Sequence, residues 1–218
     1  MRNAILTGLN AAAKATCVGL LIALACPAAA VADSLPSLFA VSGVAADDVL
    51  NIRAEPNGGA AILGTLAPGA RDVEVVAYDD TGQWAQVNTA EASGWAAQRF
   101  LAYQDAIWTP QTLPPTLRCL GTEPFWSFAP QGNAIVFSTP DDPSTPLAAK
   151  AILSTYLPGD TRRSIVAQDS SQHLTAVMVP MACSDGMSDR AYGLDVTVIL
   201  ENADGIGMLT GCCSISPH

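Results

Sequence analysis

The stretch Asp48–Pro56 reads DVLNIRAEP, in which Leu50 and Ile52 alternate with polar residues before the chain turns at residues 56–59, PNGG. Further short apolar or alternating segments follow, with Gly, Pro or Asn between them. They are Ile62–Leu66, Asp72–Val75, Trp84–Val87 and Gly94–Ala97. Side chains of a β-strand point alternately to its two faces, and short strands divided by such turns are typical of small β folds. The pattern therefore predicts a small β-barrel or sandwich over residues 38–103.

The same fragments, in this order and spacing, resemble the bacterial SH3-like domain. The resemblance rests on D-x-L-N-I-R-x-x-P from Asp48, I-L-G-T-L-x-x-G from Ile62, V-x-V from Val73, W-x-x-V from Trp84 and G-W-A from Gly94. It implies a small β-barrel that binds cell-wall or peptide ligands and performs no catalysis. On this basis we expect a groove lined by Tyr78, Trp84 and Trp95, with Asn51 and Asp79 as polar partners.

A purely structural role is the alternative for these residues. Large aromatic side chains contribute much of the apolar area that a small domain can bury. Trp84 and Trp95 are therefore expected to lie at least partly in the core on this alternative. The sequence also departs from the family pattern at Gln86, where a basic residue is common, so a charge-driven ligand contact on that strand is not expected.

A Pro-rich linker, residues 104–117, separates this region from a second one that spans residues 118–218. The second region holds short apolar segments divided by turn signals such as DDP at 141–143 and PGD at 158–160. We expect about six antiparallel strands in a meander, closed as a barrel or packed as a sandwich. One helix is expected over residues 148–156. The chain is therefore predicted to be essentially all-β.

Three local blocks stand out in the second region. They are CLGTEPFWSF (119–128), CSDGMSDRAY (183–192) and LTGCC (209–213). Together they resemble a family of uncharacterised bacterial envelope proteins, some of which are similar to META-domain heat-shock lipoproteins. The resemblance implies a periplasmic β domain and supplies no catalytic residue. Phe125, Trp126 and Met187 are expected in the core, with the lining of a pocket as the alternative.

Four cysteines follow residue 32, and an even number in an exported protein indicates disulfides. They are Cys119, Cys183, Cys212 and Cys213. A bond between Cys212 and Cys213 would close a strained ring, and neighbours on a strand point to opposite faces. We therefore expect the terminal pair to bond with Cys119 and Cys183, with either connectivity open. The alternative is redox or copper(I) chemistry at Cys212, Cys213 and Met187.

Other chemistry has little support in the residues. Asp185 and Asp189, together with Glu123, could form a calcium site, but their spacing does not follow the EF-hand pattern, and an Asx-type turn is favoured. A Cys–His nucleophile pair could use only Cys119 and His173, and the residues around them do not resemble a nucleophile motif. We therefore expect no catalytic residue, no metal site and no cofactor.

Residues 1–32 have the pattern of a signal peptide. Arg2 and Lys14 precede the apolar run ATCVGLLIALA (15–25), and AVA (30–32) fits a small-residue cleavage site. The apolar run is too short to span a bilayer comfortably, and no later run approaches 18 apolar residues. The expected product is exported, either periplasmic or secreted. The alternatives are a lipid-anchored form at Cys26 and an uncleaved anchor.

The charge balance limits the possible partners. The 218 residues include 20 acidic and 10 basic side chains, and without Arg2 and Lys14 the formal charge changes from -10 to -12. Such an excess disfavours nucleic acid and general attraction to cell-wall carboxylates. We therefore predict an exported, non-catalytic binding protein whose partner is peptidoglycan or an envelope peptide or protein. The alternative is a cell-wall hydrolase, or a redox or metal protein that uses the C-terminal cysteines.

Overall fold

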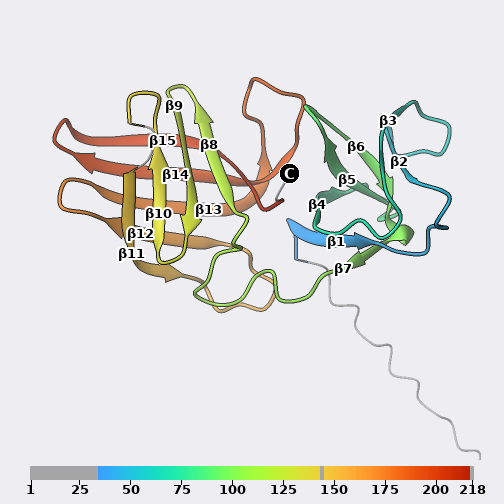
Figure 1. Ribbon diagram of the computed structural model, residues 1–218, viewed down its shortest axis with the longest axis horizontal. Helices are drawn as coiled ribbons and strands as arrows, with labels where there is room; N and C mark the ends of the chain where they lie inside the picture. The colour runs from blue at the N-terminus through green and yellow to red at the C-terminus, as the bar shows by residue number, and fades with distance from the viewer. Residues whose placement is uncertain (1–33, 143–144, 217–218) are drawn as a thin grey trace, which may run out of the picture. The chain divides into compact units, whose positions relative to one another are not determined.

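The computed structural model describes residues 34–142 and 145–216 (Figure 1). These residues form fifteen strands and a short 3-10 turn, η1 (Gln98–Phe100), but no α-helix. The strands make one seven-stranded sheet and one closed eight-stranded barrel, and every named strand pairs antiparallel to its neighbours. The predicted all-β class is confirmed. The expected signal peptide at 1–32, including Cys26, lies outside the described residues.

The sheet follows the segments that the sequence marks as strands. Its members are β1 (Ser37–Val41), β2 (Leu50–Arg53), β3 (Ile62–Leu66), β4 (Val73–Tyr78), β5 (Trp84–Thr89), β6 (Ala92–Ala97) and β7 (Leu101–Tyr103). Their order across the sheet is β3-β2-β6-β5-β4-β1-β7. The inward positions of the alternating strands, including Leu50, Ile52, Val75 and Val87, form its buried core. Gly94 allows β6 to lie close to β2, because a Cβ there would lie 2.7 Å from Cγ2 of Ile52 and 2.8 Å from the carbonyl oxygen of Arg53.

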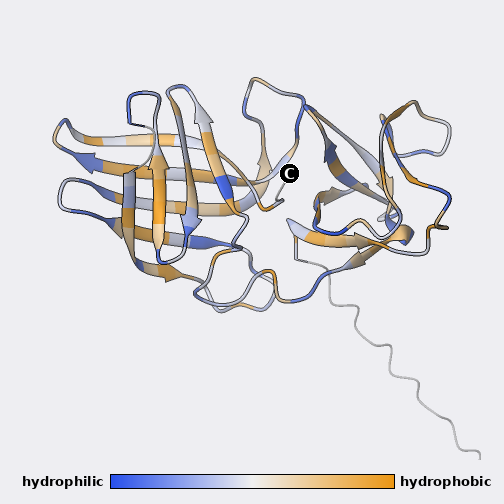
Figure 2. Cartoon of the chain, in the orientation of Figure 1, coloured by the Kyte–Doolittle hydropathy of each residue, from blue (hydrophilic) through white to orange (hydrophobic). Residues whose placement is uncertain are grey.

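The barrel contains the remaining eight strands. They are β8 (Arg118–Thr122), β9 (Phe125–Gln131), β10 (Ala134–Ser138), β11 (Thr145–Leu153), β12 (Arg163–Gln168), β13 (His173–Cys183), β14 (Tyr192–Asn202) and β15 (Gly205–Ser214). Each strand pairs with the next in sequence, and β15 pairs with β8 to close the barrel. Hydrophobic and polar residues alternate along several of these strands (Figure 2), so one face of each fills the barrel interior.

Aromatic stacking organises one part of the barrel interior. The ring centroid of Trp126 lies 5.9 Å from that of Phe128 and 6.2 Å from that of Phe137, in stacked arrangements. The indole also lies against Gly121 and Gly211, where a Cβ would overlap its ring or the neighbouring backbone. The glycines of the first and third sequence blocks are therefore required by the packing of this tryptophan.

Two expectations for the second region are wrong. The region has eight strands instead of about six, and residues 148–156 do not form a helix. Residues 145–153 instead form β11, which pairs with β10 and, with a bulge between Ala149 and Ala151, with β12. The alanines of this segment favour a helix when they are considered alone, but pairing on both sides and burial of Leu147 decide the structure.

Candidate functional site

The face of the sheet that points away from its core carries most of the expected site residues. Within β2, Asn51 and Arg53 alternate with the buried Leu50 and Ile52. Arg53 lies opposite Trp95 on β6, and Trp95 lies opposite Gln86 on β5. Strand alternation places Trp84 on the same face of β5 as Gln86. We call this face the SH3-like surface; its residues are Asn51, Arg53, Trp84, Gln86 and Trp95.

These side chains are half-buried, so each combines packing with access to solvent. Trp84 packs partly against the core of the sheet, as the structural alternative expects. The guanidinium of Arg53 donates a hydrogen bond to the carbonyl oxygen of Ala60, at 2.8 Å. This bond ties the loop between β2 and β3 to the surface, so Arg53 is a positioned cation beside Trp95. The alternation of apolar and polar residues in L-N-I-R is the sequence signal from which the place of Arg53 on this surface could have been predicted.

Tyr78 and Asp79, which were expected in the same groove, do not lie on the SH3-like surface. Tyr78 pairs with the buried Ala85 and packs against the core, which places it on the opposite face from Trp95. The carboxylate of Asp79 accepts hydrogen bonds from the hydroxyl of Thr81 and from the backbone N–H groups of Thr81 and Trp84. The hydroxyl of Thr81 is the main cause that lowers the pKa of Asp79. Asp79 thus builds the turn between β4 and β5 and fixes the start of the strand that carries Trp84.

The cysteines of the barrel form two disulfides, Cys119–Cys213 and Cys183–Cys212. The expected bonding of the terminal pair to the two earlier cysteines is confirmed. Cys119 and Cys213 lie in the barrel core, whereas Cys212 points outward from β15 and is covered by Cys183. Because all four sulfurs are bonded, the thiolate that the alternatives of a Cys119 nucleophile or a copper(I) site would need is not available in this structure.

The block that follows Cys183 forms a turn instead of a cation site. The carboxylate of Asp185 accepts hydrogen bonds from the N–H groups of Met187 and Ser188 and from the hydroxyls of Ser188 and Tyr192. Burial raises the pKa of Asp185, but these bonds outweigh burial and the net shift is downward. This is the Asx-type turn that the sequence favoured. Among residues 34–142 and 145–216, no group of three or more His, Cys, Asp or Glu side chains could hold a metal ion.

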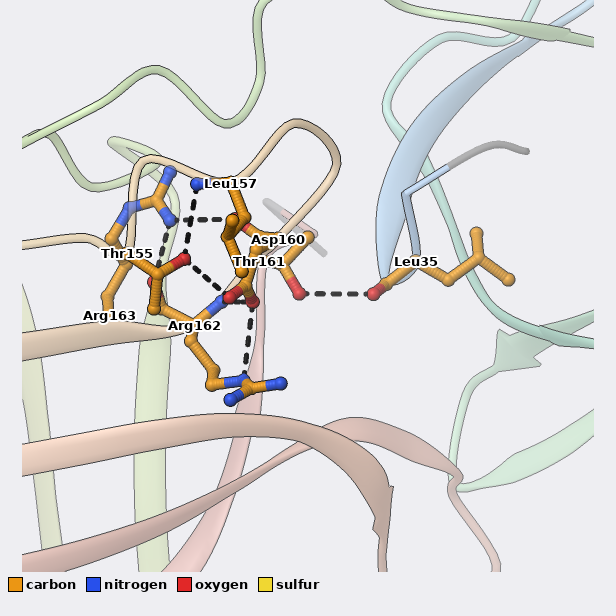
Figure 3. Close-up of polar contacts among 7 residues, drawn as sticks. All are labelled: Leu35, Thr155, Leu157, Asp160, Thr161, Arg162 and Arg163. Carbon is orange, nitrogen blue, oxygen red and sulfur yellow. Dashed lines mark hydrogen bonds and ion pairs between the residues drawn. The ribbon is translucent and has the colours of Figure 1, made fainter. Parts of the chain in front are cut away.

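Arg163 is the most deeply buried cation that the structure describes, and its hydrogen bonds hold two loops together. Its guanidinium donates to the carbonyl oxygens of Thr109, Thr112, Asp160 and Arg162, at 2.7–3.1 Å. It also lies 5.1 Å from the ring centroid of Trp108. Burial lowers the pKa of Arg163, with Asp160 opposing that shift. Figure 3 shows how Arg163 is connected to the loop between β11 and β12. In this loop the carboxylate of Asp160 accepts hydrogen bonds from the hydroxyl of Thr155 and the backbone N–H of Arg162.

Comparison with known proteins identifies one part of the chain. Residues 48–102 match the family model of the bacterial SH3 domain. This segment contains β2–β6, the first two residues of β7 and the whole SH3-like surface. The chain therefore carries a bacterial SH3 domain at residues 48–102, and this domain suggests a role in binding the cell wall or a peptide. No curated protein and no solved structure matches the chain.

The resemblance of the C-terminal region to envelope proteins and META-domain lipoproteins stays a prediction. Within the described residues, no helix is both long and apolar enough to cross a membrane.

Proposed function

We propose that the protein is an exported, non-catalytic binding protein of the cell envelope, and that its SH3-like surface holds a peptide or cell-wall ligand. The observation that carries the proposal is the match of residues 48–102 to the bacterial SH3 domain, on a sheet whose outer face presents Trp95 between Arg53 and Gln86. Export is supported by the signal-peptide pattern of residues 1–32 and by cysteines paired as disulfides.

The chemistry of the surface favours a chain that is partly polar and partly apolar. The faces of Trp84 and Trp95 offer flat apolar area to a sugar ring or a peptide side chain, while Asn51 and Gln86 can both donate and accept hydrogen bonds. Arg53 can pair with a carboxylate of the ligand. The formal charge of -10 opposes general attraction to an acidic wall, so these local contacts have to provide the affinity.

The test is co-sedimentation of the purified protein with isolated peptidoglycan and capture of envelope peptides, both at moderate salt. We expect retention of the wild type and a loss of about tenfold or more in affinity for Trp95→Ala, because aromatic anchors dominate such interfaces. Tyr156→Ala is the matched control, since Tyr156 is an exposed aromatic residue outside the SH3 domain. Failure of the wild type to bind either material, or equal binding by Trp95→Ala, would overturn the proposal.

Export is tested separately by expressing the full chain, fractionating the cells and determining the N-terminus of the recovered protein. We expect an envelope or secreted protein that begins at Asp33. A cytoplasmic protein that keeps Met1 would contradict export without bearing on ligand binding.

A further inference from the structure

A groove on the outside of the barrel brings together the three sequence blocks that the SH3 domain does not explain. One end has a volume of about 420 Å³ and the other about 760 Å³. The two ends share Leu120, Gly121, Thr122 and Phe125, so they form one continuous depression, which we call the barrel groove. The first block lines both ends, and Cys183–Met187 of the second block and Thr210 and Gly211 of the third line the larger one.

The smaller end is apolar. Phe125 is 53% exposed although it is a large hydrophobic residue, and Leu120 and Pro140 lie in the same lining. Trp126 also lines this end, and only 4% of it is exposed. Its indole N–H has no hydrogen-bond partner among the described residues. Because the indole lies in the barrel core against Gly121 and Gly211, this N–H belongs to the floor beneath the groove and not to its open surface.

The larger end is acidic. Glu123, Asp185 and Asp195 line it, and no Lys or Arg does. The carboxylate of Asp185 is occupied by its own turn. For Asp195 and Glu123, by contrast, no N–H, O–H or cationic partner is found among the described residues; one carboxylate oxygen of Asp195 lies 3.9 Å from the bonded sulfur of Cys183. The exposed Met187 adds an adaptable apolar contact beside these carboxylates.

The walls of the larger end are held in place by the barrel itself. The hydroxyl of Thr122 on β8 donates to the carbonyl oxygen of Asp185, at 2.8 Å. The Cys183–Cys212 disulfide fixes the start of the same loop to β15. A ligand would therefore meet a preformed site and would lose little free energy in ordering the loop.

We propose that the barrel groove binds an extended segment of a partner protein that carries a Lys or Arg close to an apolar side chain. The apolar side chain lies against Phe125 and Leu120, and the cation meets Asp195 and Glu123. The alkyl stem of a Lys or Arg can pack along Met187 while its charged end reaches the carboxylates. An open groove on the outer face of strands suits an extended chain better than a lipid, which pockets usually enclose. This inference does not depend on the function proposed for the SH3 domain.

The test uses a peptide array probed with the labelled full-length protein. Each decapeptide combines one apolar residue with Lys, Arg, Glu or Gln at a defined spacing, and the best basic peptide is then titrated by fluorescence anisotropy. We expect selection of basic peptides, weaker binding at high salt, and a loss of about tenfold for Asp195→Asn combined with Glu123→Gln. Phe125→Ser should weaken binding to a similar extent.

Matched controls come from the hairpin between β14 and β15. Asp204→Asn and Ile206→Ser remove an exposed carboxylate and an exposed apolar residue outside the groove, and they should leave binding unchanged. The proposal is overturned if basic peptides are not selected or if the groove variants bind as well as the controls. It is also overturned if a fatty acid displaces the peptide with higher affinity, or if Phe125→Ser converts a dimer of the protein to a monomer. Retained binding by Trp95→Ala would keep this site distinct from the SH3-like surface.

Discussion

The sheet of residues 37–103 and the barrel of residues 118–214 reach stability by different means. The sheet contains no cysteine and is held by a compact core under short strands. The barrel has longer strands, a larger core and two disulfides that join residues far apart in the sequence. Close packing is enough for the sheet, whereas the barrel adds two covalent links to its last strand, one from β8 and one from β13. The comparison predicts that removing a disulfide and disturbing a close packing contact will lower the unfolding free energy by different amounts.

The largest effect is expected from the disulfides. Their bonded cysteines are 94 residues apart for Cys119–Cys213 and 29 for Cys183–Cys212. In the chain-entropy description, removing the first pair with alanines costs about 4–5 kcal/mol of unfolding free energy and removing the second about 3–4 kcal/mol. Urea unfolding of the two double variants measures this difference. Equal losses, or a larger loss for the second pair, would show that loop length does not determine the contribution of each bond.

The next effect concerns close packing inside the barrel. A Cβ at Gly211 would overlap the carbonyl group of Leu120, whereas at Gly207, on the same strand, nothing lies within 4 Å. We expect Gly211→Ala to lower the unfolding free energy by about 2–3 kcal/mol and Gly207→Ala to change it little. Thermal unfolding followed by circular dichroism compares the two. A similar melting temperature for both variants would mean that β8 can move away from β15 at little cost.

A smaller, pH-dependent effect is expected from Glu74 on β4, which is buried. It accepts hydrogen bonds from the hydroxyl of Ser214 and from the N–H groups of Ile215 and Ser216. Burial raises the pKa of Glu74, although these bonds oppose the shift. The raised pKa stabilises the fold below the ordinary glutamate pKa, and this contribution disappears as the pH rises through the folded-state pKa.

Between about pH 4 and pH 8, wild-type stability should therefore fall more steeply than that of Glu74→Gln, whose side chain does not titrate. At neutral pH we expect the variant to differ from the wild type by about 1 kcal/mol, since the amide oxygen can still accept one of the backbone bonds. Urea titrations across this range measure the slope. Parallel stability curves for the two proteins would contradict a raised pKa.

The smallest effect is expected from an exposed ion pair on the barrel. His173 Nδ1 lies 3.6 Å from Glu201 Oε2, and more than half of each side chain is exposed. Exposed pairs contribute little, so His173→Gln should change the unfolding free energy by less than about 0.5 kcal/mol at pH 6. Chemical denaturation is again the measurement. A loss as large as that from either disulfide would reverse the ranking drawn from the comparison.

The sheet could be predicted from sequence because its signals are local. Leu50 and Ile52 alternate with polar residues within four positions, and the turns that separate the strands carry their own Gly and Pro signals. The site was harder to predict. Asp79 looks like an exposed polar partner in sequence, and only the hydrogen bonds from Thr81 and Trp84 show that it builds a turn.

The barrel could be predicted less completely because its strands depend on distant partners. The alanines of β11 favour a helix locally, and only β10 and β12 on either side make them a strand. Glu74 and Arg163 are buried although their residue types are usually exposed, since main-chain groups from distant segments satisfy them. Strand alternation argued against a bond between Cys212 and Cys213. Which of the two bonds to Cys119 and which to Cys183 could be decided only from the closed barrel.

The placement of Cys212 and Cys213 on adjacent residues of β15 also sets an order of events. Cys119 and Cys183 both bond to cysteines on β15, the last strand of the barrel. The same strand pairs with β8 and so closes the barrel. During synthesis, neither native bridge can form until β15 has emerged. The chain is therefore not covalently locked in a partial barrel by its native bonds, and native oxidation follows the arrival of the final strand.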